Sequence, residues 1–270
     1  MFSKSEASTC LLIGGIILMD KLKSLILAAG KGTRMASDLP KVLHKVCDKP
    51  MVLYAINAAA DAGAVESCVI IGYKGSLVKR EVETYIKTGD IKGPVTFVEQ
   101  KEQLGTGHAV KCAADFIGTE GNIMILCGDT PLITGATLKK LYDTHIKSGN
   151  GVTVLSAILP DATGYGRIIR DENGDFQKIV EQKDCNEKEA AVKEINSGMY
   201  IFNSEALTVS LGRITNNNAQ GEYYLTDTIA LIKDAGMKVG AVPVDNNDEI
   251  LGVNTRTQLE VAEKIMSERN

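Results

Sequence analysis

The sequence has few of the residues that build transition-metal sites or disulfide frameworks. Only three histidines occur among 270 residues, and the six cysteines form no C-x-x-C pair. These counts disfavour a histidine-rich metal centre and indicate reduced thiols in a cytoplasmic protein. Internal repeats, low-complexity tracts and a linker rich in proline or serine are also missing, which favours a single α/β domain.

Neither charge nor hydropathy points to a nucleic-acid or membrane partner. The formal charge is −4, with 30 Lys and Arg against 34 Asp and Glu, whereas nucleic-acid and lipid-surface binders are usually basic. The apolar run over residues 10–19 is too short to span a bilayer and lacks a small-x-small cleavage site. We expect residues 1–18 to be an N-terminal extension that need not be ordered, because Met19 directly precedes the first predicted strand.

The hydrophobic residues follow two different patterns in the two halves of the chain. From residue 23 to about 150, short β-branched runs alternate with longer amphipathic segments, which predicts a Rossmann-like, mostly parallel sheet flanked by helices. The strands expected there are 23–28, 65–72, 95–99, 123–127 and 151–159, and the helices are 50–62, 77–87, 106–116 and 137–148. Shorter segments follow from about residue 160 and predict a smaller antiparallel subregion. The elements expected in this second half are a hairpin around 171–175, strands 199–202 and 237–244, and helices 224–233 and from 255 onward.

A glycine-bearing loop follows the first predicted strand and carries two cations. Gly30 and Gly32 allow the backbone to turn sharply and to bring its N–H groups against an anion. Arg34 and Lys41 would then neutralise the oxygens of a triphosphate. Walker and dinucleotide motifs are both excluded, because a lysine stands between the glycines and Met35 occupies the place of the third small residue. The loop therefore predicts a phosphate site of another kind.

Asp129 follows another predicted strand, and the carboxyl ends of parallel strands meet at one edge of a sheet. Its carboxylate would face the phosphate loop, with Gly128 allowing close backbone approach. Because a carboxylate repels a polyphosphate, this arrangement needs a hard divalent cation, and Mg²⁺ fits best. Asn254 could complete the coordination or act as the N-cap of the last helix. The alternative for Asp129 is a turn or cap residue before Pro131.

One segment after the third strand suggests recognition of a base. Gln100 offers the donor and acceptor that a uracil edge requires, and Gly105 allows close approach. The alternative is an ordinary helix start with Thr106 as its N-cap, and spacing alone favours this alternative.

Three residues of the second half suggest recognition of a sugar. Gly166, Glu181 and Asn196 are of the types that hexose sites use. Taken singly, each is better explained as a turn glycine, a surface charge or a strand-end amide. Residues 221–227 are expected to pack mostly as a helix, and they receive no catalytic role.

Five motifs, in order along the chain, resemble those of the sugar-phosphate nucleotidylyltransferases. They are LAAGKGTRM at 27–35 with PKVL at 40–43, EQLGTGHA at 102–109, GYGRI at 164–168, NNAQGEYY at 217–224 and GVN at 252–254. Together they narrow the resemblance to the N-terminal uridylyltransferase domains of bifunctional enzymes that make UDP-N-acetylglucosamine. The resemblance runs from about Met19 to the end of the chain and implies a nucleotide-diphospho-sugar transferase fold.

The resemblance also implies a role for each matching residue. Arg34 and Lys41 would contact the nucleotide phosphates, and Asp129 with Asn254 would ligate Mg²⁺. The substrate-binding residues that it implies are Ala28, Ala29, Gly30, Gln100, Gly105 and Thr106 for the uridine nucleotide, and Gly166, Glu181 and Asn196 for the acetylamino sugar. Gly128 is expected to be a further substrate-binding residue. Cys127 departs from the family, in which tyrosine often occupies this position.

The implied reaction transfers the uridylyl group of UTP to N-acetylglucosamine-1-phosphate and releases pyrophosphate through metal-assisted in-line attack. Two alternatives stay open. A related enzyme could use dTTP or CTP with another sugar phosphate, because the glycine-bearing loop is shared across the family. The chain could also be a nucleotide-sugar binding module without catalysis.

The resemblance further divides the chain into a nucleotidylyltransferase domain over 19–254 and a helical arm over 255–270. The bifunctional enzymes continue into hexapeptide repeats that acetylate glucosamine-1-phosphate, and no such repeats occur in this sequence. We therefore expect no acetyltransferase activity. Because those repeats drive trimer formation in the family, a monomer or a weak homo-oligomer is expected.

Overall fold

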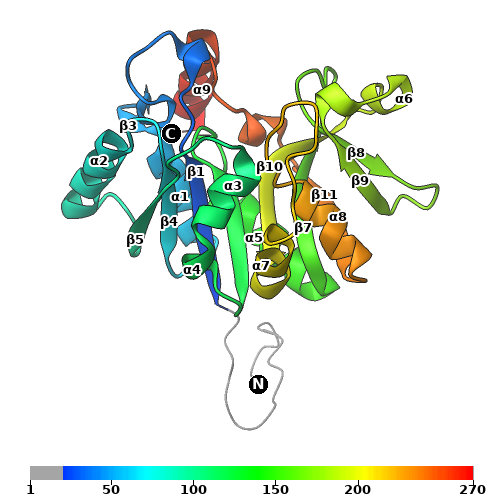
Figure 1. Ribbon diagram of the computed structural model, residues 1–270. Helices are drawn as coiled ribbons and strands as arrows, with labels where there is room; N and C mark the ends of the chain where they lie inside the picture. Colours follow the sequence, from blue (N-terminus) through cyan, green and yellow to red (C-terminus); the bar gives the residue numbers. More distant parts are fainter. Residues whose placement is uncertain (1–20, 270) are drawn as a thin grey trace, which may run out of the picture.

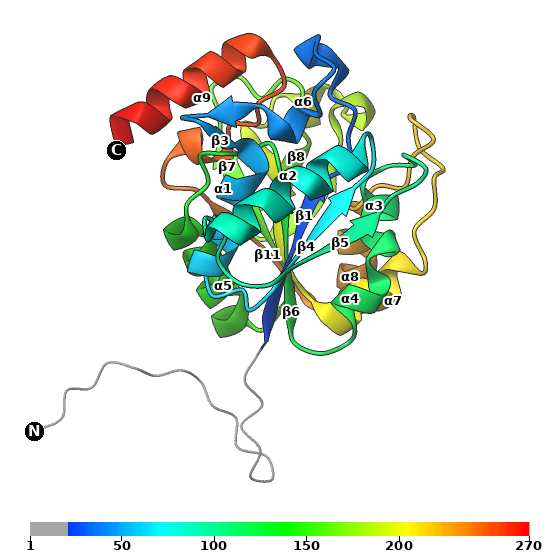
Figure 2. The ribbon, with the colours of Figure 1, turned by 90° about the vertical axis from the view of Figure 1, so that its left-hand side faces the viewer.

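The computed structural model describes residues 21–269 as a sheet with helices packed on both of its faces (Figure 1). The view from the side shows the same layers, with α2 and the edge strand β5 toward the viewer (Figure 2). The predicted extension over residues 1–18 lies outside the described residues. Within residues 21–269, no helix is both long and apolar enough to cross a membrane.

Nearly all strands of the described chain belong to one mixed sheet. The strand bounds are β1 Leu22–Ala28, β2 Lys45–Val46, β3 Lys49–Pro50, β4 Ser67–Ile71, β5 Val95–Glu99, β6 Asn122–Cys127, β7 Asn150–Ile158, β8 Arg167–Arg170, β9 Phe176–Val180, β10 Glu194–Asn203 and β11 Lys238–Pro243. The order across the sheet is β11-β7-β10-β6-β1-β4-β5, with β8 and β9 attached beside β10. Strands β1, β4, β5 and β6 pair in parallel, whereas β10 runs antiparallel to β6 and β7. The separate β2–β3 hairpin is short and antiparallel.

The helices alternate with the strands through most of the chain. Their bounds are α1 Met51–Asp61, α2 Gly75–Thr88, α3 Thr106–Cys112, α4 Ala114–Ile117, α5 Gly135–Ser148, α6 Glu187–Ala190, α7 Ser204–Leu211, α8 Asp227–Asp234 and α9 Arg256–Arg269. Short 3₁₀ turns lie at Thr33–Met35, Lys41–Leu43, Gln182–Asp184 and Asn247–Ile250.

The central strand β1 shows why both faces of the sheet need a helical layer. Ile26 packs into a core cluster that includes residues of α1, α2 and α5, whereas Leu25 packs into a second cluster with residues of α3, α7 and α8. Both side chains are fully buried. A strand that is apolar on both sides is stable only between two such layers, so the run at 22–28 specifies a central position.

The strand directions bring several loops to one edge of the sheet. β1, β4, β5 and β6 all end at this carboxyl edge, because they are parallel to one another. The opposite direction of β10 brings its first residues, rather than its last, to the same edge. The β8–β9 pair projects beside it, at the right of Figure 1.

The predicted fold class is confirmed, and most predicted elements lie within two residues of those in the structure. The expected helix 106–116 is divided at Ala113 into α3 and α4. The prediction that residues 221–227 pack mostly as a helix is wrong, because α8 begins only at Asp227. The preceding residues follow the start of α3 instead, and Tyr223 N donates to Leu104 O at 2.8 Å.

Candidate active site

The glycine-bearing loop, residues 29–41, leaves the carboxyl end of β1 and returns with Lys41 at the same edge. Gly32 has φ +64°, and a Cβ placed there would lie 2.6 Å from the Cβ of Lys41. Glycine is therefore required at position 32 both by its backbone angle and by the packing of the Lys41 stem. At Gly30, an added Cβ meets no atom within 4 Å, so this position opens to solvent.

Four polar side chains from distant parts of the chain meet beside this loop. The ammonium of Lys41 contacts Asp129 Oδ2 and donates to Asn254 Oδ1 at 2.9 Å. Arg34 Nη2 also donates to Asn254 Oδ1, at 2.8 Å. The structure therefore brings together the predicted phosphate ligands and the predicted metal ligands. The Asp129 carboxylate faces Lys41 instead of capping a turn, which favours the site interpretation over the alternative.

The backbone fixes Asp129 and Asn254 relative to each other. Val253 N donates to Asp129 O at 2.9 Å, which holds the two segments side by side. Thr255 and Gln258 cap α9, because Gln258 N donates to Thr255 Oγ1 and Gln258 Oε1 accepts from Thr255 N. The alternative that Asn254 is the N-cap is therefore wrong, and its side-chain oxygen is free to face the loop.

This arrangement fits a hard cation with few protein ligands. Asp129 and Asn254 direct oxygens at one shared positive charge, which Lys41 supplies in this structure. Among residues 21–269, no group of three or more His, Cys, Asp or Glu side chains could hold a metal. Further ligands would have to be phosphate oxygens and water, as is usual for Mg²⁺.

Gly128 and Cys127, next to Asp129, pack against the neighbouring strands β1 and β10. An added Cβ at Gly128 would lie 3.0 Å from Leu27 O, so the close approach here is to the end of β1. Cys127 Sγ contacts Gly198 O at 3.6 Å, and burial together with nearby Asp129 raises the pKa of its thiol to about 12. The thiol is therefore a protonated packing group and no nucleophile.

The predicted base-binding segment, residues 100–107, is fixed by internal hydrogen bonds and by packing against residues 223–225. Gln100 is 4% exposed, and its Nε2 donates to Gly105 O at 3.1 Å. Thr106 Oγ1 accepts from Leu225 N at 3.2 Å, so the interpretation of Thr106 as the N-cap of its own helix is wrong. Glycine is required at 105 because a Cβ there would lie 2.6 Å from Tyr223 O.

Gly166, Glu181 and Asn196 come together as predicted. Asn196 N donates to Gly166 O at 2.9 Å, and a Cβ on Gly166 would lie 3.3 Å from Glu181 Oε2. Burial raises the pKa of Glu181, although a hydrogen bond from Thr226 Oγ1 at 3.1 Å opposes this effect, and Asp184 and Asp227 raise the pKa further.

The side chain of Asn196 has a fixed orientation. Its Oδ1 accepts from Gly198 N at 3.0 Å, and its Nδ2 donates to the Tyr200 hydroxyl at 2.8 Å. Asn196 is 9% exposed, and Tyr200, which belongs to the same strand β10, is also buried. One Nδ2 hydrogen therefore remains to be donated to a ligand.

Sequence reasoning missed Thr226 and the groove beside it. A groove of about 400 Å³ runs between β9 and α8, and its lining includes Glu181, Tyr224, Thr226 and Asp227. The sequence predicts a sugar contact at Glu181, but it predicts a mostly helical 221–227 with no catalytic role and gives no signal for Thr226. Glu181 both lines this groove and lies beside Gly166.

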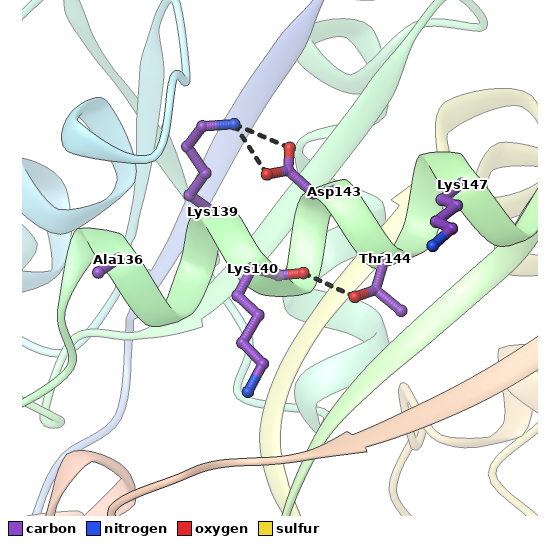
Figure 3. Close-up of a pocket in the computed structure, with 6 residues that line it drawn as sticks. All are labelled: Ala136, Lys139, Lys140, Asp143, Thr144 and Lys147. Carbon is purple, nitrogen blue, oxygen red and sulfur yellow. Dashed lines mark hydrogen bonds and ion pairs between the residues drawn. The ribbon is translucent and has the colours of Figure 1, made fainter. Parts of the chain in front are cut away.

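A second hollow, over α5, has no features of a functional site. It measures about 480 Å³ and is lined by one face of that helix (Figure 3). Lys139 pairs with Asp143 at 2.8 Å, and Thr144 Oγ1 donates to Lys140 O, as is common on helix surfaces. The site at the carboxyl edge is therefore the candidate.

Comparison with known proteins is consistent with this geometry. Residues 23–248 match the nucleotidyl transferase family model. The protein of *Caldanaerobacter subterraneus* subsp. *tengcongensis* named bifunctional protein GlmU is 53% identical over 251 residues, which are 93% of this chain and 53% of the relative. Proteins of the same name from *Thermoanaerobacter pseudethanolicus* and *Clostridioides difficile* are 51% and 49% identical, over 93% and 92% of this chain and 53% and 52% of theirs. This chain thus spans about half the length of the curated relatives it matches.

A solved structure gives the same result for the fold. The crystal structure of a UDP-glucose pyrophosphorylase complexed with UDP-glucose superposes with a TM-score of 0.75 at 22% identity, covering 93% of this chain and 100% of that one. Identity at this level supports the nucleotide-diphospho-sugar transferase fold alone. Because the family model covers most of the chain, the protein belongs to the nucleotidyl transferase family.

Proposed function

We propose that this chain transfers the uridylyl group of UTP to N-acetylglucosamine-1-phosphate, giving UDP-N-acetylglucosamine and pyrophosphate. The observation that carries the proposal is the meeting of Arg34, Lys41, Asp129 and Asn254 at the carboxyl edge. Segments proposed to bind the base and the sugar follow strands that end at, or begin from, the same edge. The similarity to proteins named bifunctional protein GlmU supports the choice of substrates.

Membership of the nucleotidyl transferase family generally implies that a divalent metal is needed, and the residues at the carboxyl edge fit such an ion. We propose Mg²⁺, held by Asp129 and Asn254, with the remaining ligands from phosphate and water. When bound, the ion would neutralise charge that develops on the triphosphate.

The residues of the chain act by orientation and charge. The acceptor phosphate is already anionic, so no protein nucleophile is needed. Its oxygen bonds to the α-phosphorus of UTP while the bond to the bridging oxygen breaks, and pyrophosphate leaves with that electron pair. Arg34, Lys41 and the N–H groups of the loop would hold the charged oxygens in line.

The nucleotide would lie along the ends of β1, β5 and β6. The residues proposed to surround it are Ala28, Ala29, Gly30, Gln100, Gly105, Thr106 and Gly128. Gln100 and the Gly105 carbonyl are already joined by a hydrogen bond, which supports a preformed edge for the base.

The sugar pocket has a defined polarity that suits the proposed acceptor. Asn196 has one Nδ2 hydrogen left to donate, whereas Glu181 Oε2, beside Gly166, is a hydrogen-bond acceptor. A sugar that carries an amide carbonyl and free hydroxyl groups offers the complementary acceptor and donors. We therefore propose Gly166, Glu181 and Asn196 as sugar contacts, with Thr226 orienting Glu181.

We also propose that residues 19–254 are the catalytic domain and that the arm, 255–270, supports the site. Within the described residues, the α9 cap positions Asn254, and Arg269 Nη1 donates to Leu132 O at 2.6 Å. The cysteines described are all free, which supports a reducing, cytoplasmic environment.

Pyrophosphate release from a substrate panel tests the proposed reaction. UTP with N-acetylglucosamine-1-phosphate and Mg²⁺ should be the most efficient pair, and chelation should abolish turnover. dTTP, CTP and other sugar phosphates serve as competitors. A preference for one of them would identify the related transferase, whereas binding of UDP-N-acetylglucosamine without turnover of any pair would identify a binding module.

Asp129→Ala should lower kcat by about 100-fold or more, because it removes a charged group from the reacting centre. Asp143→Ala is the matched control, since this exposed carboxylate pairs only on the surface of α5 with Lys139. Near-normal turnover in Asp129→Ala would remove Asp129 from the site.

A further inference from the structure

Lys41 contacts the two side chains that are proposed to hold the metal. Its ammonium contacts Asp129 Oδ2 and Asn254 Oδ1, and these two side chains are the proposed Mg²⁺ ligands. The side chains of Lys41 and Asp129 are each only 17% exposed, so water screens this contact weakly. One ammonium therefore satisfies both oxygens in the absence of other cations.

The stem of Lys41 is directed toward this position by the loop. Its Cβ, Cγ and Cδ lie 2.6, 3.3 and 3.4 Å from the place where a Cβ on Gly32 would be, so the stem lies directly against that glycine. Lys41 begins a 3₁₀ turn after Pro40, which fixes where the stem leaves the backbone. The contact with Asp129 is therefore a packed arrangement, and it is more than an exposed ion pair.

The local charge is unfavourable for a metal while Lys41 stays in place. Arg34 donates to the same Asn254 oxygen, so two cationic side chains already converge on this amide oxygen, and of these only Lys41 pairs with the Asp129 carboxylate. A divalent ion added to this cluster would be repelled by both. The phosphates of a nucleotide would relieve the repulsion, because they offer Lys41 and Arg34 an alternative anionic partner.

We infer that Lys41 competes with the divalent metal for Asp129 and Asn254, and that metal binding releases its ammonium to the nucleotide phosphates. This inference rests on the proposed function for the identity of the site. Metal and triphosphate then favour each other's binding. The triphosphate draws Lys41 away from the metal ligands, and the metal frees the Lys41 ammonium to bind the phosphates. Lys41 is thus a positioning residue for the metal site as well as a phosphate ligand.

Binding of Mn²⁺ to the nucleotide-free chain tests the competition without any turnover. Mn²⁺ titrations followed by isothermal calorimetry or electron paramagnetic resonance should show an affinity about tenfold higher in Lys41→Met than in the wild type. Lys41→Gln should show a similar gain. Lys31→Met is the matched control, because it removes one positive charge from the same loop while its ammonium lies over Tyr73. Its Mn²⁺ affinity should stay within about twofold of the wild type.

Thermal unfolding provides a second measurement if Lys41→Met is less stable. Mn²⁺ should raise the unfolding temperature of this variant more than that of the wild type, because tighter binding to the native state stabilises it more. Equal or weaker Mn²⁺ binding by both Lys41 variants would overturn the inference. An equal gain in Mn²⁺ affinity in Lys31→Met would also overturn the inference, because the loss of any one positive charge from the loop would then explain the gain.

The outcomes separate this inference from the proposed reaction. A wild-type chain that makes product while Lys41→Met shows no gain in Mn²⁺ affinity overturns only the competition. A chain that makes no product while Lys41→Met gains affinity overturns only the proposed reaction. Loss of the gain in Lys41→Met combined with Asp129→Asn would assign the bound ion to Asp129, and its persistence would overturn the inference.

Discussion

At the scale of single residues, the β2–β3 turn places two L-amino acids in the left-handed region. Cys47 has φ +44° and Asp48 has φ +65°, and the flanking pairs are Lys45 with Pro50 and Val46 with Lys49. A two-residue hairpin turn of this kind favours Asn-Gly or Asp-Gly. The strain is offset because the hairpin buries Val46 in a cluster with residues of the loop and of α9.

Asp48→Gly should therefore stabilise the protein. We expect the free energy of unfolding to rise by about 0.5–1 kcal/mol, because glycine adopts positive φ without steric cost but gains entropy in the unfolded chain. Urea unfolding measures this change. Asp48→Ala removes the same carboxylate while keeping the strain, so it should not stabilise. A similar gain in both variants would show that charge, and not backbone angle, is responsible.

At the scale of secondary-structure elements, His145 joins α5 to the strands beneath it. Its Nδ1 and Nε2 lie 2.9 Å from Thr153 Oγ1 and 3.0 Å from Asn122 Oδ1, in β7 and β6. The residue is 2% exposed, and burial lowers its pKa to about 4. His145 is therefore neutral in the folded protein. It lies beside Asn122, the first residue of β6, and so at the end of the sheet opposite the carboxyl edge.

Folding stability should fall in acid because of His145. Between its unfolded pKa of 6.5 and its folded pKa of about 4, the unfolded chain binds a proton that the folded chain excludes. The contribution is complete above pH 6.5 and is lost as the pH falls toward 4, by up to about 3 kcal/mol. Unfolding free energies measured across this range should fall less steeply in His145→Gln. His108→Gln is the control, and an unchanged slope in His145→Gln would contradict the assignment.

Hydropathy patterns predicted most elements because each strand and helix buries a continuous face. The failures occur where tertiary contacts override a local pattern. The composition of residues 222–225 is compatible with a helix, but the backbone of Tyr223 bonds to Leu104 and Gly107, and α8 begins only at Asp227. The short α7, Ser204–Leu211, was missed because its eight residues give little periodic signal, although Asn203 caps it by accepting from Ala206 N.

At the scale of the whole molecule, residues 222–226 connect the proposed base-binding segment to the proposed sugar contacts. Tyr223 N donates to Leu104 O and Gly107 N donates to Tyr223 O, both at 2.8 Å. Three residues later, Thr226 donates to Glu181. A displacement of either half therefore moves the other, so the two substrates should not bind independently.

Gly107→Ala should disturb both halves together. An added Cβ would lie 2.7 Å from Ile214 Cδ1 and 2.9 Å from Tyr223 O, which forces the connecting segment away from α3. We expect a loss of about 1–3 kcal/mol in stability and higher KM values for both substrates. Gly212→Ala is the control, since its nearest atom is Val209 O at 3.4 Å and its φ is −69°. A rise in only one KM would contradict the coupling.

The topology predicted from the sequence was sufficient to place Asp129 near the glycine-bearing loop, because parallel strands end at a common edge. Asp129 and Gly30 follow neighbouring strands, so their proximity depends only on the topology. The partners of each side chain could not be predicted in the same way. The contact of Lys41 with Asn254 spans 213 positions and depends on how α9 docks. The contact of Thr226 with Glu181 depends on residues before α8 whose composition resembles that of a helix.

The antiparallel direction of β10 has a consequence for the thermodynamics of recognition. Asn196 lies within this strand, where it pairs with Ser156 and its N–H is bonded to Gly166 O. A residue held on both sides by a sheet has little motion to lose when a ligand arrives. The proposed sugar contact at Asn196 should therefore carry almost no ordering entropy, unlike the proposed phosphate contact of Lys41, which requires that side chain to leave Asp129.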